Sequence, residues 1–226
     1  MRARVRQACE RSGRSVEEVT IVAVAKTFGP EDVMRMAAAG LTLFGENRVQ
    51  EARQKIPLCS GSLEWHLVGH LQRNKVRDAV RLFSMVHSAD SVRLLEALEG
   101  ACAAAGKTLP VCLEVNVSGE SSKQGLKPEE VPTVLDRCGG LRNVEVVGLM
   151  TIPPFAPEPE AARPFYRRLR ELREAWRAGS GFPLEHLSIG MSNDFEVAVE
   201  EGATLVRLGT VLFGPRGRRA RQRGPG

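Results

Sequence analysis

Short apolar runs alternate with amphipathic stretches along almost the whole chain. The first run, 20–25, is rich in β-branched residues, which is typical of a buried strand. Pro30 follows at a position where a helix can begin, and Gly40 marks its end. The same alternation continues along the chain and predicts strands at 20–25, 41–45, 65–69, 83–88, 110–117, 144–150, 186–189 and 204–208. Helices are predicted between them at 31–39, 46–56, 71–82, 92–105, 128–138, 159–177 and 193–201.

Strands that alternate with helices form a parallel sheet, and eight such repeats are the number that closes a (β/α)8 barrel. An open doubly wound sheet is the structural alternative. It usually carries fewer strands, and no G-x-G-x-x-G motif follows the first predicted strand. We therefore predict an α/β fold with a single (β/α)8 TIM barrel domain at 1–214. An extra N-terminal helix is expected at 2–12, and a disordered tail rich in Arg, Gly and Pro at 215–226.

Composition is that of a globular domain that can bury its own core, with 42% hydrophobic and 26% charged residues in 226. The net charge of +5 comes from the tail, which holds five arginines and no acidic residue. The rest of the chain has equal numbers of basic and acidic residues, so no basic field points to a nucleic-acid partner. An interaction protein whose arginine tail binds nucleic acid or membrane remains an alternative.

No run approaches the roughly 18 consecutive apolar residues that a membrane span needs, and the charged segment 1–14 lacks the features of a secretory signal. The five cysteines are scattered and show no C-x-x-C spacing. We expect a cytoplasmic protein without a membrane partner. His66 and His70 lie four apart, but on a predicted strand and with no third ligand nearby, so no metal is expected.

Lys26 closes the first predicted strand. Alternation along a strand places Val22, Val24 and Lys26 on one face. If that face lines the barrel, desolvation lowers the pKa of the amine and makes it nucleophilic. A lysine that forms a Schiff base needs this environment. The alternative is a lysine that extends from the strand end into solvent.

An anion site is predicted where the last two strands end. Ser192 and Asn193 precede a predicted helix, Asn193 and Glu196 have the spacing of a capping box, and Gly209 and Thr210 follow the last strand. Barrel enzymes often bind phosphate in the loops after strands seven and eight, at free backbone N–H groups. Because strands one and eight are neighbours in a closed barrel, the lysine would lie beside this site. Alternatively, the serine only caps a helix and the glycines only form turns.

An amine that reacts with aldehydes, next to a phosphate site, suggests pyridoxal 5′-phosphate. Arg207 is a charged residue in an otherwise apolar predicted strand. Facing the pocket, it could donate a hydrogen bond to the pyridine nitrogen and keep that nitrogen unprotonated. Alternatively, it pairs with a carboxylate at the base of the barrel.

Several motifs together resemble those of one family. They are VAVAKT at 22–27, FGENRVQE at 44–51, WHLVGHLQRNK at 65–75, VN at 115–116, Lys123 with Gly125, GLMT at 148–151, LSIGMSND at 187–194, VRLGT at 206–210 and FG at 213–214. The sequence resembles the pyridoxal phosphate homeostasis protein family over about residues 2–216. It is also similar to the barrel domain of alanine racemase, without the second domain of that enzyme.

The resemblance implies a barrel that carries pyridoxal phosphate as a Schiff base on Lys26. It implies a protein without established catalytic activity, involved in vitamin B6 and amino-acid homeostasis, with apo-forms of pyridoxal phosphate enzymes as possible acceptors. A monomer is expected because no dimerising domain is present. The cofactor-binding residues that the resemblance implies are Lys26, Asn47, Met150, Ser192, Arg207, Gly209 and Thr210.

A pyridoxal phosphate-dependent amino-acid racemase is the alternative function. Racemisation needs proton donors on both faces of the cofactor ring, and Lys26 could serve one face. The second donor is normally a tyrosine, but Tyr166, the one tyrosine of the chain, falls within a predicted helix rather than at a strand end. His70, His87 or a cysteine could substitute, and nothing in the sequence singles one out.

Overall fold

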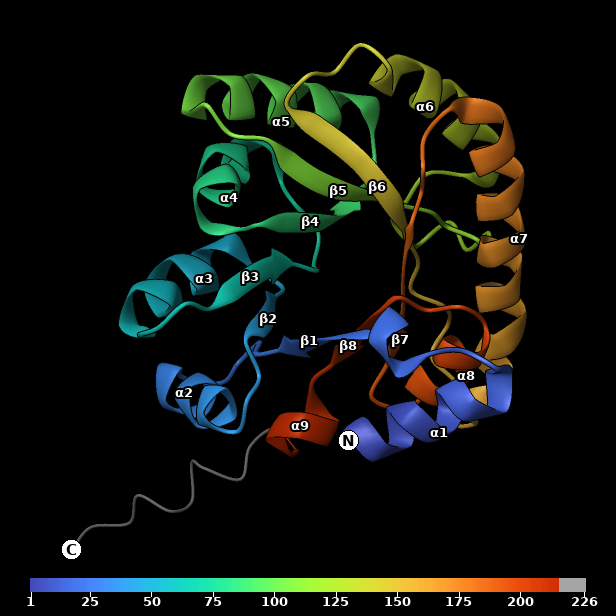
Figure 1. The fold of residues 1–226 in the computed structure, drawn as a ribbon. Coiled ribbons are helices and arrows are strands. Elements are labelled where there is room, and N and C mark those ends of the chain that lie inside the picture. The colour runs from blue at the N-terminus through green and yellow to red at the C-terminus, as the bar shows by residue number, and fades with distance from the viewer. Residues whose placement is uncertain (216–226) are drawn as a thin grey trace, which may run out of the picture.

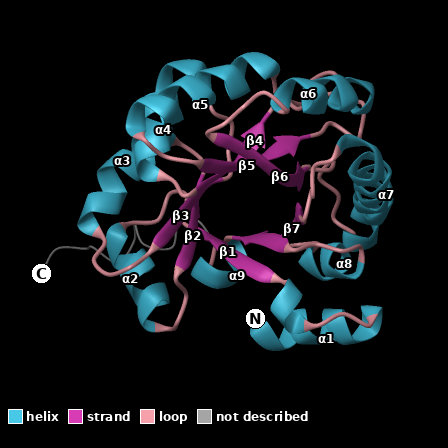
Figure 2. Cartoon of the chain, turned by 45° about the horizontal axis from the view of Figure 1, so that its top comes forward, coloured by secondary structure: helices cyan, strands magenta, loops and turns pink. Residues whose placement is uncertain are grey.

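The computed structural model describes residues 1–215, and these form a closed barrel of eight parallel strands surrounded by helices (Figures 1 and 2). Each strand pairs with its neighbour in sequence, and β8 pairs with β1 to close the ring. The predicted (β/α)8 barrel is confirmed. The strands are β1 (Thr20–Val24), β2 (Leu43–Glu46), β3 (Glu64–Leu67), β4 (Met85–Ala89), β5 (Leu109–Glu114), β6 (Val144–Met150), β7 (His186–Met191) and β8 (Leu205–Leu208).

Helices follow the strands and form the outer layer. They are α1 (Arg2–Ser12), α2 (Pro30–Ala38), α3 (Val49–Lys55), α4 (Val76–Leu82), α5 (Val92–Ala105), α6 (Val131–Cys138), α7 (Arg163–Ser180), α8 (Phe195–Glu200) and α9 (Thr210–Phe213). Short 3-10 turns are η1 (Val16–Glu18), η2 (Ile56–Leu58), η3 (Arg73–Lys75), η4 (Pro128–Glu130) and η5 (Pro159–Ala162). No helix of residues 1–215 combines the length and the apolar character that crossing a membrane requires.

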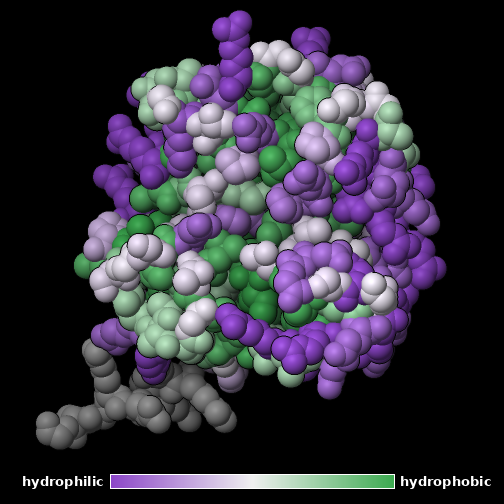
Figure 3. All heavy atoms as spheres, in the orientation of Figure 1, coloured by the Kyte–Doolittle hydropathy of each residue, from purple (hydrophilic) through white to green (hydrophobic). Residues whose placement is uncertain are grey.

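The N-terminal helix α1 packs on the outside of the barrel against α8, as Figure 1 shows. Arg4 reaches Glu196 with its Nε and Nη2 atoms at 3.1 and 3.0 Å, and Arg11 Nε lies 2.7 Å from Glu200 Oε1. On the neighbouring wall, hydrophilic side chains gather over α7, where Figure 3 is strongly purple. The N-terminal helix expected from the sequence is therefore confirmed, with a charged seam to the barrel.

Two buried clusters follow from the alternation of strand side chains. The larger cluster lies between the strands and the helices, and it includes Ala23 and Ala25. The smaller cluster fills the barrel interior and consists of Val22, Val24, Val68, Met85, Cys112, Met150 and Leu205. Because side chains at i and i+2 share one face of a strand, this interior set identifies which polar residues also face inward.

Element boundaries differ from the predicted ones mainly where strands give way to loops. The strand predicted at 110–117 ends at Glu114, and the helix predicted at 46–56 begins at Val49 because Glu46 still belongs to β2. A short helix that was not predicted, α9, follows β8 directly. The predicted tail lies outside the described residues from position 216 onward.

Candidate functional site

The predicted site residues follow the carboxyl ends of five strands. Asn47 comes directly after β2, and Met150 is the last residue of β6. Lys26 follows β1, Ser192 follows β7, and Gly209 and Thr210 follow β8. In a closed parallel barrel these strand ends form a single mouth, so the structure brings the predicted residues to one end of the molecule.

Lys26 lies two residues beyond Val24, and its side chain is half-buried. Both Val22 and Val24 belong to the interior cluster, so alternation continues their face to Lys26 at the mouth. The next residue, Thr27, has a φ of 67°, which turns the chain sharply away from the strand. The backbone of Lys26 therefore lies at the rim of the barrel, just beyond the end of β1.

Backbone donors converge on the side chain of Ser192. Its Oγ atom accepts hydrogen bonds from Gly209 N at 3.1 Å and from Val211 N at 3.4 Å. These donors stand at the first turn of α9, where N–H groups lack partners within the helix. The structure thus places Ser192, Gly209 and Thr210 together beside the end of β1, because β8 pairs with β1.

The predicted capping box at Asn193 is wrong. The N-cap residue of α8 is Asp194, whose Oδ1 accepts a hydrogen bond from Met191 N at 2.7 Å. Asn193 turns away and donates through Nδ2 to the backbone oxygen of Ala156 at 3.1 Å. The backbone donors that converge at this end of the barrel therefore belong to the start of α9 and not to the helix after β7.

Arg207 is 5% exposed and lies inside the barrel, on the same strand face as Leu205. Its Nη1 donates to the backbone oxygen of Ser188 and, at 2.7 Å, to Ser188 Oγ. Its Nη2 donates to the backbone oxygen of Thr151 at 3.0 Å, just beyond the end of β6. Three of the five guanidinium N–H groups are engaged in this way, so the head group is held near the mouth and not at the base of the barrel.

A buried chain of hydrogen bonds continues from Arg207 across the barrel. His87 Nδ1 lies 2.7 Å from Ser188 Oγ, and His87 Nε2 lies 2.9 Å from His66 Nδ1. Because arginine can only donate, the Ser188 oxygen accepts from it, and the Ser188 hydroxyl keeps its own hydrogen for a second partner. If that hydrogen is donated to His87 Nδ1, His87 carries its proton on Nε2 and donates it to His66.

Both histidines in this chain are kept neutral. Burial, with nearby His186 acting in the same direction, lowers the pKa of His66 to about 4. Burial likewise lowers the pKa of His87 well below its ordinary value, with His66 and Arg207 acting in the same direction. His66 lies on β3, as predicted, and no group of three or more His, Cys, Asp or Glu side chains within residues 1–215 could hold a metal ion.

Glu114, the last residue of β5, is a site residue that the sequence did not single out. It lies two residues beyond Cys112 of the interior cluster, so its side chain faces into the barrel, and it is 7% exposed. Burial raises the pKa of Glu114 to about 7, while Arg207 lowers it and Asp90 raises it. A carboxyl group that titrates near neutrality at the mouth can take up or release a proton there.

A buried ion pair supports the end of β1 from outside the barrel. Lys55 Nζ donates to the backbone oxygen of Ala25 at 2.6 Å and pairs with Glu46 Oε1. Glu46 is fully buried, and burial raises its pKa although Lys55 lowers it. The pair ties α3 and β2 to the residue directly before Lys26, a connection that the sequence spacing did not reveal.

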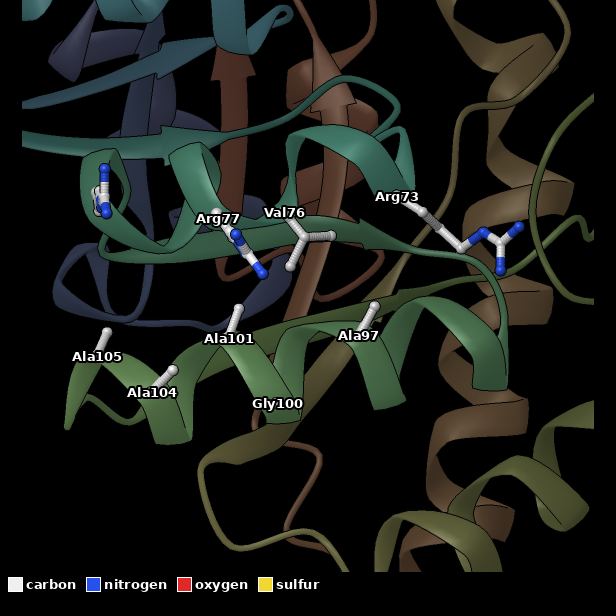
Figure 4. Close-up of a pocket in the computed structure, with 9 residues that line it drawn as sticks. Arg73, Val76, Arg77, Ala97, Gly100, Ala101, Ala104 and Ala105 are labelled. Atoms are coloured by element: carbon white, nitrogen blue, oxygen red, sulfur yellow. The ribbon is translucent and has the colours of Figure 1, made fainter.

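Two hollows lie near the barrel wall. One, of about 600 Å³, lies beside the mouth and is lined by Asn47, Arg48, Val49, Gln50, Glu51, Gly69, His70, Gln72 and Lys75. The other, of about 580 Å³, lies between α4 and α5 (Figure 4) and is lined by Arg73, Val76, Arg77, Arg81, Ala97, Gly100, Ala101, Ala104 and Ala105. Of these two hollows, the first adjoins the predicted site because Asn47 lines it.

Comparison with known proteins identifies the family to which the chain belongs. The family model for the alanine racemase N-terminal domain matches residues 1–217. The pyridoxal phosphate homeostasis protein of Aquifex aeolicus is 43% identical over 94% of this chain and 94% of its own length. The chain belongs to the pyridoxal phosphate homeostasis protein family. The member from Pseudomonas aeruginosa is also 43% identical, over 95% of this chain and 92% of that protein.

Solved structures of the family share the same barrel. PipY of Synechococcus elongatus PCC7942, solved without PLP, superposes with a TM-score of 0.85 at 36% identity, covering 93% of this chain and 99% of that one. The same protein with PLP bound gives a TM-score of 0.83 at 35% identity over the same shares of the two chains. Alanine racemase of Corynebacterium glutamicum, 20% identical, matches in fold with a TM-score of 0.66 and covers 93% of this chain and 59% of the enzyme.

Proposed function

We propose that this protein binds pyridoxal 5′-phosphate at the barrel mouth, as a Schiff base on Lys26, and holds it for delivery to apo-enzymes that need it. The observation that carries the proposal is the juxtaposition of an amine at the end of β1 with backbone donors at the start of α9, on the adjacent strand β8. An aldehyde and a phosphate on one small molecule would engage both. PipY, at 35% identity, has been solved with PLP bound.

The residues at the barrel mouth are suited to bind pyridoxal 5′-phosphate. Gly209 N and Val211 N already donate to a hydroxyl oxygen, that of Ser192, and would serve phosphate oxygens equally well. Arg207 keeps two N–H donors beyond its bonds to Ser188 and Thr151, enough for a ring nitrogen. Asn47 and Met150 would line the sides of the cofactor. When bound, the group supplies an electrophilic aldehyde, and the protein residues orient it.

The role that we propose is that of a cofactor carrier in vitamin B6 and amino-acid homeostasis. Residues 1–214 would form the binding domain and act as a cytoplasmic monomer. Neutral His66 and His87 behind Arg207 leave that cation without a counter-charge in the chain of hydrogen bonds, which favours an unprotonated ring nitrogen. Such a ring is a weak electron sink, and this suits retention of the cofactor better than chemistry at a substrate carbon.

An absorbance scan of the purified protein tests the proposal. A Schiff base on Lys26 gives near-visible absorbance that borohydride removes, and the reduced peptide then carries the added mass at Lys26. Lys26→Ala should lose this absorbance, whereas the exposed Lys127→Ala should keep it. Reduced cofactor on another lysine, or no absorbance after incubation with pyridoxal phosphate, overturns the proposal.

The racemase alternative requires a second proton donor at the ring. Tyr166 lies on α7 and is fully buried, and burial raises the pKa of its hydroxyl. These observations disfavour it as that donor. Incubating the loaded protein with L-alanine and following D-alanine decides between the two functions, because sustained turnover would replace the carrier role by a catalytic one.

A further inference from the structure

Charge is divided across the barrel mouth. On the side of β7, β8 and β1 lie hydrogen-bond donors and the cations Lys26 and Arg207. On the side of β4 and β5 lie two carboxylates, Asp90 and Glu114, which are close enough for Asp90 to raise the pKa of Glu114. One half of the mouth therefore suits an anion, and the other half suits a cation.

Glu114 differs from Asp90 in its partners. Asp90 Oδ2 lies 3.2 Å from His70 Nδ1, and Asp90 Oδ1 accepts a hydrogen bond from Ser91 Oγ at 3.2 Å. The Glu114 residue is 7% exposed, and no hydrogen bond recorded among residues 1–215 reaches its carboxyl oxygens, which are not among the fully buried oxygens that lack a partner. A carboxylate in this largely desolvated position would be stabilised by a hydrogen-bond donor that reaches its oxygens from the mouth.

The position of Glu114 relates it to the proposed cofactor site. It is opposite Met150 in the parallel register of β5 and β6, and it interacts electrostatically with Arg207 of β8. The charged or titratable groups that face it are Arg207 from β8 and Asp90 from the end of β4, while Met150 of β6 contributes no charge. A ligand that contacts Arg207 and Met150 would thus lie near this carboxyl group.

We infer that Glu114 forms a binding subsite for the ammonium group of a primary amine and accepts a proton from it. The inference rests on the proposed function, because the amine is the acceptor that takes the cofactor aldehyde from Lys26. The proton moves from the amine nitrogen to a carboxylate oxygen, which yields a neutral amine with a free lone pair and a neutral carboxylic acid. No oxidant or further co-reactant is needed. Free amino acids and lysine side chains of other proteins share this chemistry.

The first test uses the full chain without cofactor. The titration of the Glu114 carboxyl is followed by NMR with glutamate labelled at the side-chain carboxyl carbon, and Glu114→Gln assigns the resonance. Methylammonium chloride should lower the titration midpoint, whereas potassium chloride at equal ionic strength should not, because an ammonium donor stabilises the ionised form. Equal midpoints in the two salts would overturn the inference. Glu145, exposed on β6, should respond alike to both salts.

The second test uses the loaded protein and two kinds of nucleophile. L-alanine and Nα-acetyl-L-lysine are ammonium ions at neutral pH and need a base, whereas hydroxylamine is mostly neutral and does not. Glu114→Gln should slow cofactor removal by the amines at least about tenfold and leave removal by hydroxylamine unchanged. Glu145→Gln should change neither rate. An effect on only L-alanine, or only the lysine derivative, identifies which source of amine the subsite accepts.

The two proposals fail in different ways. If the protein forms no Schiff base at all, the proposed function fails at the absorbance scan, before any rate is measured. If the cofactor binds at Lys26 and Glu114→Gln slows the amines and hydroxylamine equally, or slows neither, the carrier role stands and the subsite at Glu114 is refuted.

Discussion

The Nζ atom of Lys55 lies 2.6 Å from the backbone oxygen of Ala25, the residue directly before Lys26. Lys55 also pairs with Glu46, and both side chains are buried between α3 and the strands. The carbonyl at the end of β1 is therefore held by a charged donor from outside the barrel, while Lys26 itself faces the mouth. The buried Lys55 thus positions the backbone directly before Lys26.

Breaking this buried pair should cost much stability. Lys55→Met leaves Glu46 buried without a counter-charge. This change should lower the free energy of unfolding by about 4 kcal/mol. Urea unfolding followed by circular dichroism measures the loss. Replacing both residues, Lys55→Met with Glu46→Leu, should recover part of it because no buried charge remains.

The exposed pair Arg48–Glu51, at 3.6 Å, serves as control, and Arg48→Ala should cost about 0–1 kcal/mol. Equal losses at the two pairs would contradict this account.

The pKa of Glu114 makes stability depend on pH in a defined direction. The group has a raised pKa in the folded state, about 7 against 4.5 for its ordinary value, so between these pH values the folded protein holds a proton that the unfolded chain has lost. The stabilising contribution of Glu114 to the free energy of unfolding is therefore fully present below pH 4.5. It is lost as the pH rises through 7, which lowers the free energy of unfolding by about 3 kcal/mol.

Glu114→Gln should remove this dependence and make the protein more stable than the wild type at pH 8. Unfolding free energies of the two proteins at pH 5, 6, 7 and 8 provide the measurement. His66, with its lowered pKa, contributes the opposite slope in both proteins, so the difference between them isolates Glu114. A difference that stays constant over this range would show that the carboxyl group titrates normally.

The sequence pattern was sufficient for the barrel because each buried strand is a short apolar run, and the helices between the strands have clear boundaries. It also placed Lys26, Ser192 and Gly209 correctly at strand ends, since the end of an apolar run is visible in sequence. Glu114 was missed for a related reason. The predicted strand ran to 117, so Glu114 fell within it, whereas β5 ends at Glu114 and Asn116 N donates to Leu126 O instead of continuing the sheet.

The hydrogen-bond chain inside the barrel could not be predicted in this way. His66, His87 and Ser188 belong to three strands, and their contacts depend on the register between strands and on the direction of each side chain. Neither quantity leaves a periodic signal in the sequence. The same holds for the pair of Lys55 and Glu46, whose separation of nine residues matches no helical or strand repeat.

Close packing between β2 and the turn after β3 predicts a sensitive glycine. A Cβ atom added at Gly69 would lie 2.8 Å from Asn47 Cα and would also meet the Asn47 backbone oxygen. Gly69→Ala should therefore displace Asn47, lower stability by about 1–3 kcal/mol and weaken cofactor binding. Gly100→Ala is the control, because Gly100 lies within α5 with open space around it, and it should raise stability by up to about 1 kcal/mol. Thermal unfolding and a pyridoxal phosphate titration of both variants decide the matter, and unaltered binding by Gly69→Ala would refute the role given to this contact.

Ser188 connects Arg207 to the two buried histidines, so its hydroxyl should matter more than its size. Ser188→Ala removes one acceptor of Arg207 and leaves His87 Nδ1 without its donor, which should cost about 1–3 kcal/mol. Ser188→Thr keeps a hydroxyl and should retain more of the stability, within the room that the barrel interior allows.

Nitrogen NMR of histidine provides a readout that packing alone would not change. In the wild type, His87 should be neutral from pH 5 to 8 with its proton on Nε2, because its pKa is lowered well below the ordinary value and Ser188 donates to Nδ1. In Ser188→Ala the Nδ1 resonance should shift as that hydrogen bond is lost, and Ser188→Thr should restore it. If Nδ1 of His87 carries the proton in the wild type, His87 donates to Ser188 and the direction assigned to these hydrogen bonds is wrong, while a His87 that carries both protons would refute its neutral state.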